Sequence, residues 1–280
     1  MTTAVQAYAP TAVSRASWFE RATPGQALLI GAALFLLLAM LPTFLTMAIE
    51  VRTLNGINVW IKPAKFEFSV AVQFLTVAWF LQLLPPEQRA SRLATGLCQT
   101  MAAVGILEIA YIALQASKGE ASHFNSSTPL SLALYSLMGI GAITMLSISG
   151  WLGIMILRHG DSSKPFVSIT GLSLIAGSLL GALTGIFMSM HHGHWVGGLH
   201  TDVGGLPTFG WSRSGGDLRV AHFFGMHIMQ AVPIATWLTG FALPRSQLKA
   251  AGLMLLGAAI LVAAGTFAQA VTGHPFIALG

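Results

Sequence analysis

Six of the nine histidines lie between Met188 and Gln230, a stretch that also contains methionines and many glycines. Imidazole is the commonest side-chain metal ligand, and thioether sulfur shifts the preference towards copper. The candidate metal ligands in this stretch are Met188, His191, His192, His194, His222 and His227. The stretch begins at the end of one apolar run and finishes inside the next. These groups are therefore expected at or just below a membrane surface, where ionisable side chains are costly and usually functional.

The first apolar run predicts a helix over residues 166–192. Its glycines repeat every four residues, which is typical of a close-packing ridge between membrane helices. The ridge consists of Gly177, Gly181 and Gly185 and is interpreted as a packing surface between helices, with a surface for a helical partner as the alternative. At about 100° per residue, His192 falls within ~20° of Gly185 and is expected to point at the same neighbour.

The next run predicts a helix over residues 219–243, with Asp217 as its N-cap. His222 and His227 lie about 140° apart on it, so they are poorly placed to hold one ion from one side. One interpretation is a haem b held by His192 and one of these two histidines. The other is copper bound by Met188, His191, His192 and His194. Either would suit electron transfer or an oxidoreductase, working with a redox partner.

Two further polar groups lie deep in predicted helices. Glu108 is expected some 13 Å from the outer end of a helix over residues 92–116, a depth similar to that of His227. An isolated carboxylate there would be protonated or would find a cation, so contact with His227 is expected. With Gln230, the two residues would form a polar relay. The alternative is a neutral Glu108 that holds two helices together.

Lys62 and Lys65 lie at the start of the helix predicted over about residues 64–84, where cations oppose the helix dipole. They could extend to lipid headgroups, pair with carboxylates, or contact an anionic group such as a haem propionate or a lipid phosphate.

The composition indicates the class of protein. Hydrophobic residues make up 54% of the 280 residues and charged residues only 8%, against roughly 25% charged in soluble domains. Several apolar runs reach the ~20 residues that cross a bilayer as helix. The chain is therefore predicted to be an all-α, polytopic membrane protein, with the lipid bilayer as its main partner. Lysines and arginines are scattered at helix ends, which argues against nucleic-acid binding.

Seven transmembrane helices are expected in one bundle, residues 25–273. They cover approximately residues 26–49, 64–84, 92–116, 129–157, 166–192, 219–243 and 247–272. A cytoplasmic or interfacial segment, 1–24, precedes the bundle, and a tail, 274–280, follows it. The glycine- and tryptophan-containing loop 193–218 is expected to fold over the outer helix ends. Connections on the side of the amino terminus carry eight basic residues and the opposite side six, which predicts a cytoplasmic amino terminus and an external carboxyl terminus.

Three motifs resemble those of an uncharacterised family of bacterial seven-helix integral membrane proteins. They are W-I-K-P-A-K-F from Trp60, S-H-F-N from Ser122 and G-G-D-L-R-V-A-H-F from Gly215. The resemblance extends from Asn55 to Pro233 and implies a bacterial inner membrane, without implying an activity.

Three functional classes follow from the sequence. The first is a membrane protein that binds haem b or copper near the outer leaflet. The second is a proton-coupled transporter that uses Glu108, His227 and Gln230. The third is a non-catalytic assembly or sensing protein, in which outer histidines respond to pH near neutrality.

Overall fold

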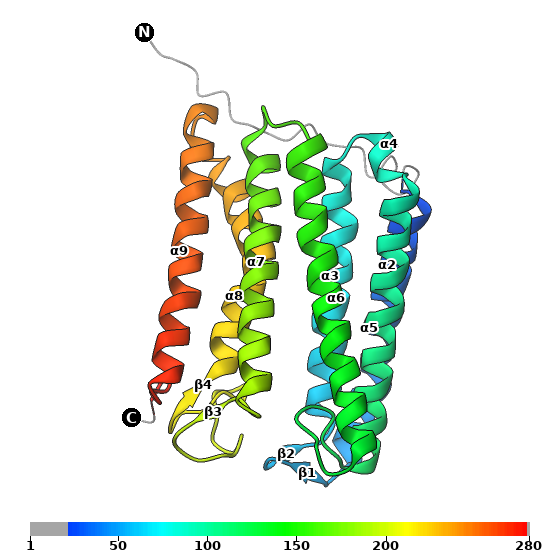
Figure 1. The fold of residues 1–280 in the computed structure, drawn as a ribbon, viewed down its shortest axis with the longest axis vertical. Coiled ribbons are helices and arrows are strands. Elements are labelled where there is room, and N and C mark those ends of the chain that lie inside the picture. Colours follow the sequence, from blue (N-terminus) through cyan, green and yellow to red (C-terminus); the bar gives the residue numbers. More distant parts are fainter. Residues whose placement is uncertain (1–21, 279–280) are drawn as a thin grey trace.

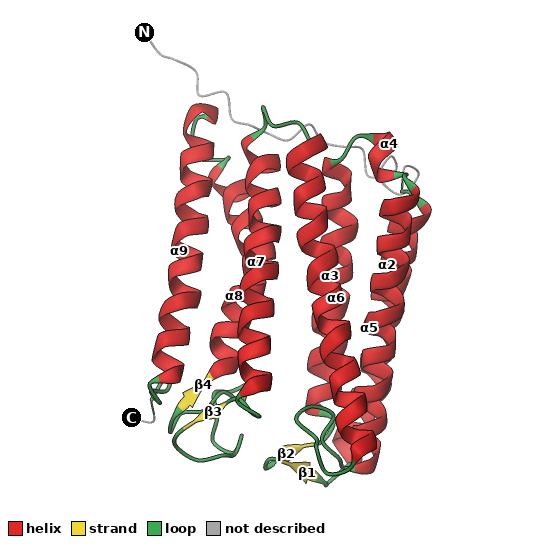
Figure 2. Ribbon diagram, viewed as in Figure 1, coloured by secondary structure: helices red, strands yellow, loops and turns green. Residues whose placement is uncertain are grey.

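The structure is a computed structural model that describes residues 22–278. Within this range, seven helices of 20 or more residues run side by side (Figures 1 and 2). They are α2 (Pro24–Ile49), α3 (Ile61–Phe80), α5 (Arg92–Lys118), α6 (Pro129–His159), α7 (Pro165–Met190), α8 (Leu218–Thr239) and α9 (Arg245–Val271). Six of them, all except α8, are long and apolar enough to cross a membrane. The chain is therefore an all-α protein of the multi-pass membrane class.

Three connections gather at one end of the bundle, which we call the loop end (Figure 1). They join α2 to α3, α5 to α6 and α7 to α8, and α9 also finishes there. In the first connection, β1 (Thr53–Leu54) pairs antiparallel with β2 (Ile57–Asn58). In the third, β3 (Trp195–Val196) pairs antiparallel with β4 (Gly216–Asp217). Among residues 22–278, the connections at the opposite end contain two short elements, the 3-10 turn η1 (Leu81–Leu83) and α4 (Pro86–Arg89).

The helix starts follow from local capping chemistry. Thr128 caps α6, because its Oγ1 accepts a hydrogen bond of 3.0 Å from the backbone N–H of Ser131, and Pro129 occupies the first helical position. Asp217 caps α8 in the same way, accepting from the N–H of Arg219 at 3.0 Å. Both starts agree with the sequence prediction. By contrast, α3 begins without a side-chain cap at Trp60 and leaves its first N–H groups without that partner.

The helices pack in two groups joined by α6. In the first group, α2 packs against α3 and α5, and in the second, α8 lies between α7 and α9. Helix α6 contacts both α5 and α7. The largest apolar core lies among α2, α3, α5 and α6 and includes the fully buried Phe74 and Met101. Helices α3 and α8 therefore come from different groups, and both begin at the loop end.

The glycine ridge of α7 faces α8 of the same chain. A Cβ added at Gly177 would lie 2.5 Å from Met229 Cγ, and one at Gly181 would lie 2.6 Å from Met226 Cγ. The absence of side chains at these positions lets the two helices approach closely. The ridge is thus an internal packing surface, not a free surface for another protein.

One predicted helix end differs from the structure, and the predicted terminal segments lie partly outside the described residues. Helix α7 ends at Met190, two residues before the predicted end, and His192 adopts a left-handed backbone conformation with φ of 55°. The helical angle that placed His192 on the glycine face therefore does not apply to it. The predicted segment 1–24 lies outside the described residues up to residue 21, as do residues 279–280 of the tail.

Candidate functional site

The first turn of α8 carries an arginine that holds two carboxylates. The guanidinium of Arg219 donates to Asp217 at 2.6 and 2.9 Å, to Asp202 at 2.7 Å, and to the carbonyl oxygen of Gly210 at 2.8 Å. Asp202 and Asp217 are buried, with relative exposures of 7% and 1%. Charge-assisted bonds of this kind are about twice as strong as neutral ones. We call these three charged residues the Arg219 clasp.

The clasp fixes the long loop over the helix ends. The backbone N–H of Asp202 donates to the carbonyl of Asn55 in the β1–β2 turn at 3.0 Å, so the loop reaches from α8 across to the start of α3. At the other end of the loop, the N–H of Leu218 donates to the carbonyl of His194 at 2.8 Å. The expected loop over the helix ends is therefore present, and the β3–β4 pair gives it regular structure that the sequence did not indicate.

His194 is buried beneath this loop, with Nε2 3.9 Å from a carboxylate oxygen of Asp202. Burial lowers the pKa of His194 below its usual value, although the neighbouring aspartates act to raise it. Burial raises the pKa of Asp202, but His194 and Arg219 outweigh that effect and leave the pKa below its usual range. At neutral pH the loop therefore presents neutral imidazole and ionised carboxylate.

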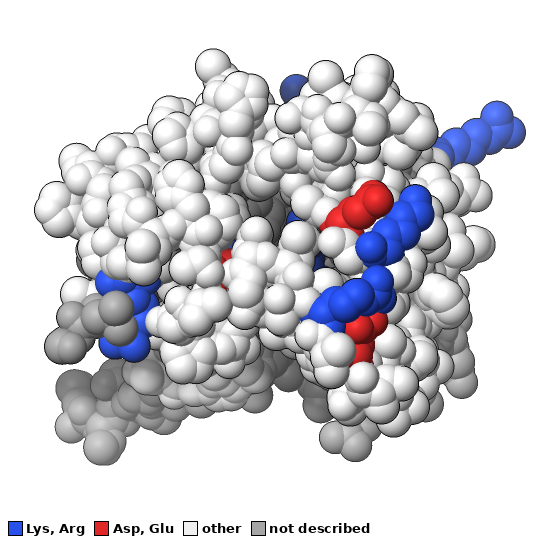
Figure 3. Space-filling view, turned by 90° about the horizontal axis from the view of Figure 1, so that it is seen from below, with Lys and Arg blue, Asp and Glu red and all other residues white. Residues whose placement is uncertain are grey.

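Two lysines at the start of α3 lie beside the clasp without a carboxylate of their own. Lys62 Nζ donates to Nδ1 of His123 at 3.1 Å, and Lys65 Nζ donates to the carbonyl of Phe209 at 2.9 Å. Neither lysine forms an ion pair with any residue in 22–278. Both side chains are half-buried. Figure 3 views the loop end and shows charged atoms recessed towards the middle of this face, besides those at its edge.

His123 belongs to this cluster, although it was not among the site residues predicted from the sequence. Its Nδ1 accepts from Lys62 and lies 3.1 Å from Ser122 Oγ, which requires the neutral ring. Burial, followed by the charge of Lys62, lowers the pKa of His123 well below its usual value. The S-H-F-N motif was the sequence signal, but no spacing rule connects His123 to a lysine 61 residues earlier.

The geometry makes the cluster electropositive. With both lysines protonated, Lys62, Lys65 and Arg219 carry three formal positive charges against the two negative charges of Asp202 and Asp217, a net +1. Helices α3 and α8 also both begin here, and the positive ends of their dipoles add to the same field. Because Arg219 already engages both carboxylates, the two lysines retain N–H donors for an anion.

The predicted metal ligands lie in separate exposed and buried positions. His191 and His192 are exposed, and His191 Nε2 lies 3.2 Å from the carbonyl of Trp195. Within residues 22–278, no group of three or more His, Cys, Asp or Glu side chains is arranged to hold a metal ion. Met188 is buried in a small apolar cluster with Leu218 and Ala270. The haem and copper interpretations stay predictions.

The two α8 histidines have local neighbours. His222 Nδ1 lies 2.9 Å from Thr184 Oγ1 of α7, a hydrogen bond that fixes the ring against the glycine ridge. His227 packs on Phe223, with ring centroids 4.3 Å apart. Both contacts are of the ordinary structural kind that a partly buried imidazole needs.

The predicted relay residues lie in two separate places. Glu108 is buried where α5 meets α6, and a Cβ added at Gly141 would lie 2.5 Å from its Oε1. That oxygen has no hydrogen-bond partner in the part of the chain that the structure describes, and the expected contact with His227 is not among the ion pairs there. Gln230 instead bonds to α3, donating to Gln73 Oε1 at 2.9 Å.

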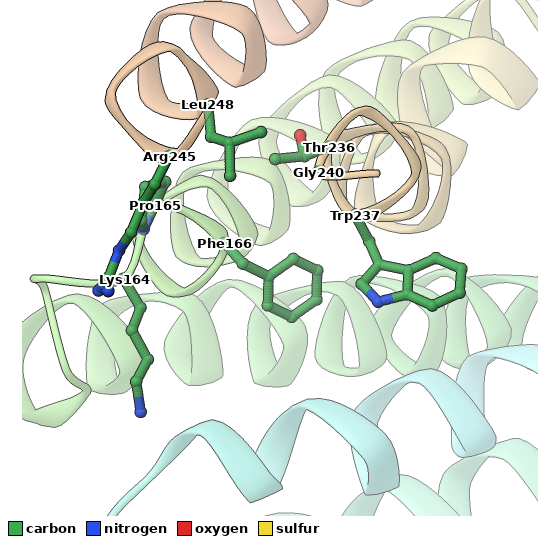
Figure 4. Close-up of a pocket in the computed structure, with 8 residues that line it drawn as sticks. All are labelled: Lys164, Pro165, Phe166, Thr236, Trp237, Gly240, Arg245 and Leu248. Carbon is green, nitrogen blue, oxygen red and sulfur yellow. The ribbon is translucent and has the colours of Figure 1, made fainter. Parts of the chain in front are cut away.

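A shallow groove at the opposite end is a second candidate site (Figure 4). Phe166 and Trp237 lie next to each other in its wall, with Arg245 and Lys164 towards one side. Lys164 is paired with Asp161 at 3.2 Å, and Arg245 donates to the carbonyl of Ser163 at 3.4 Å. Its cations are thus exposed and locally bonded, so the cluster at the loop end is the stronger candidate.

The motifs that resemble a bacterial membrane family remain a sequence-based resemblance. A scan against protein-family models and searches of curated proteins and of solved structures found no match to this chain.

Proposed function

We propose that this chain is a multi-pass membrane protein that binds a small anion at the loop end, between the first turns of α3 and α8. The observation that carries the proposal is the pairing pattern of the charges. Arg219 engages both buried aspartates, whereas Lys62 and Lys65 engage only a neutral imidazole and a carbonyl oxygen. Half-buried ammonium groups without a directly paired carboxylate are costly, and an anion between them relieves that cost.

The donors suit a carboxylate or a phosphate group. Each ammonium has three N–H donors and uses one of them within the protein. A unit negative charge ~4 Å from an ammonium gains about 4 kcal/mol in a partly buried setting, before its own desolvation is counted. Two lysines together therefore support binding of an oxyanion. The same chemistry fits a free anion, a lipid headgroup or a haem propionate.

The proposed topology places this site outside the cytoplasm. In this topology α8 also crosses the membrane, which raises the number of spans from six to seven. It is the least apolar of the long helices, but it is flanked by α7 and α9. The basic residues then put the loop end and the carboxyl terminus on the external side of a bacterial inner membrane. Binding of haem or copper by the histidines is not favoured by a specific contact, so it is not part of the proposal.

The test uses the thermal stability of the purified protein in detergent. At constant ionic strength, inorganic phosphate or acetate should raise the unfolding temperature of the wild-type chain relative to chloride. The double variant Lys62→Gln/Lys65→Gln should lose that response. Lys118→Gln is the matched control, because Lys118 is exposed at the same end of the bundle.

A second arm tests lipid as the source of the anion. The wild-type protein and the double variant are compared in nanodiscs of phosphatidylcholine and of phosphatidylglycerol. Stabilisation by phosphatidylglycerol alone would identify a headgroup, and stabilisation by phosphate alone a free anion. Equal behaviour of the wild-type and double-variant proteins in every condition would refute the proposal.

A further inference from the structure

Polar residues continue from the anion site into the bundle along one face of α3. Lys62, Lys65, Ser69, Gln73 and Thr76 follow each other at spacings of three, four, four and three residues. At 3.6 residues per turn these spacings keep all five side chains on one stripe. Ser69 is exposed and Gln73 is half-buried, so the stripe is not sealed by neighbouring helices. A polar stripe of this length is unusual for a helix that crosses a bilayer.

Helix α8 carries polar residues at the same two depths as the stripe on α3. Arg219 and Gln230 are separated by eleven residues, as are Lys62 and Gln73. Eleven residues are about three turns, so each pair shares a helix face and spans roughly 16 Å. Because α3 and α8 both begin at the loop end, the charged residues meet at one depth and the two glutamines at another.

The glutamines form a polar cluster that joins three helices. Gln230 Nε2 donates to Gln73 Oε1 at 2.9 Å and lies 3.3 Å from Thr76 Oγ1. Gln73 Nε2 in turn donates to Ser149 Oγ of α6 at 2.7 Å. Within the described residues, Gln230 Oε1 is buried and has no hydrogen-bond partner. An amide oxygen in that position is costly in hydrocarbon unless water or a ligand bonds to it.

We propose that the line along which α3 faces α8, from Lys62 and Lys65 to the hydrogen-bonded Gln73–Gln230 pair, is a water-filled path that small anions enter from the loop end; we call it the contact line. The inference rests on the proposed anion site and extends it from binding to passage. The amide cluster closes the path at its inner end, and Gln230 Oε1 is satisfied by water in the open path.

The chain is well suited to a thiol-accessibility test. Its single cysteine, Cys98, is buried, with a relative exposure of 2%, so background labelling is low. Gln73→Cys and Gln230→Cys place a thiol on either side of the path. Leu75→Cys is the matched control, because Leu75 is exposed on another face of α3 at nearly the same depth. Each variant is first checked for a monodisperse, folded protein.

The reagents are two membrane-impermeant methanethiosulfonates, one anionic and one cationic, added to the loop side of reconstituted vesicles. The anionic reagent should label Gln73→Cys or Gln230→Cys about ten-fold faster than Leu75→Cys, and faster than the cationic reagent does, because the entrance is positively charged. Replacing Lys62 and Lys65 with glutamine in the same variant should remove the preference for the anionic reagent.

Two results would overturn the inference. Labelling of both glutamine positions only by lipid-soluble N-ethylmaleimide would mean that lipid occupies the contact line, and no labelling by any reagent would mean tight packing. Either result is separable from the binding proposal, which is measured by phosphate-dependent stability in the lysine double variant. Equal rates for the anionic and cationic reagents would overturn selection for anions.

Discussion

Replacement of Arg219 by methionine is the sharpest test of how the loop end is held together. Methionine keeps much of the apolar volume of the side chain and removes every charge-assisted bond. It leaves Asp202 and Asp217, both buried, without their cation. Loss of one partner from a buried ion pair typically costs 3–5 kcal/mol, since the remaining charge is left uncompensated.

The structure places the expected cost at the lower end of that range. The Arg219 side chain is 26% exposed, so water can partly reach the aspartates after the substitution. We expect Arg219→Met to lower the free energy of unfolding by about 3 kcal/mol. Asp202→Asn removes one charge-assisted bond and should cost about 2 kcal/mol. The double variant should cost about 3 kcal/mol, because the two substitutions disrupt one network.

The assay is reversible unfolding in mixed micelles with increasing sodium dodecyl sulfate, followed by tryptophan fluorescence. Proteinase K cleavage between residues 197 and 215 reports separately on release of the loop. Arg245→Met is the control, because Arg245 is exposed at the opposite end, and it should stay within about 0.5 kcal/mol of the wild-type value.

The reasoning would be refuted by an Arg219→Met variant within about 1 kcal/mol of the wild-type protein whose loop still resists cleavage. Strict additivity of Arg219→Met and Asp202→Asn would show that the two residues are not coupled, and would also contradict the clasp.

Three further outcomes are expected. The pKa of His123 is lowered in the folded protein, so its contribution to stability is present above the unfolded value of about 6.5 and is lost as pH falls below it. His123→Gln should therefore reduce, without abolishing, the loss of unfolding free energy measured between pH 7 and 5, and His194 is one of the groups that contribute to the remaining slope. Gly177→Ala should lower the free energy of unfolding by about 1–3 kcal/mol, because its Cβ meets Met229 at 2.5 Å. Gly185→Ala should lower it by under about 1 kcal/mol, because the nearest contact of that Cβ is the His222 ring at 3.3 Å. Equal melting temperatures for the two variants would contradict the close approach of α7 and α8. Gly141→Ala should destabilise by a similar 1–3 kcal/mol, mainly through its contact with Glu108, and the same change in a Glu108→Ala background should cost clearly less in thermal unfolding, because only the 3.0 Å contact with Val104 then remains.

The helices were predictable because apolar runs and caps are local signals. Thr128 with Pro129, and Asp217 before α8, mark helix starts by the hydrogen bonds they make within four residues. Helix ends are less well marked. Extending α7 by two residues was enough to place His192 on the wrong face, because each residue turns the helix by about 100°.

The site was predicted only in part, because its residues meet through tertiary contacts. Lys62 and Lys65 stood out because cations oppose a helix amino terminus, and they do lie in the candidate site. Asp202 gave no such signal, since it sits in a glycine-rich loop and reaches Arg219 only when the loop folds back. Gln73 was missed because an amide carries no formal charge, although its place on the stripe with Lys62 was readable from spacing alone.

Because the loop is hydrogen-bonded to α8 through Arg219, it also fixes the depth of that helix in the bilayer. A moderately polar helix of 22 residues is free to slide along the membrane normal unless something anchors one end. A guanidinium bonded to loop carboxylates provides such an anchor at the interface. Weakening this attachment should therefore change the depth of every side chain on α8, and with it the register of Gln230 against Gln73 of α3.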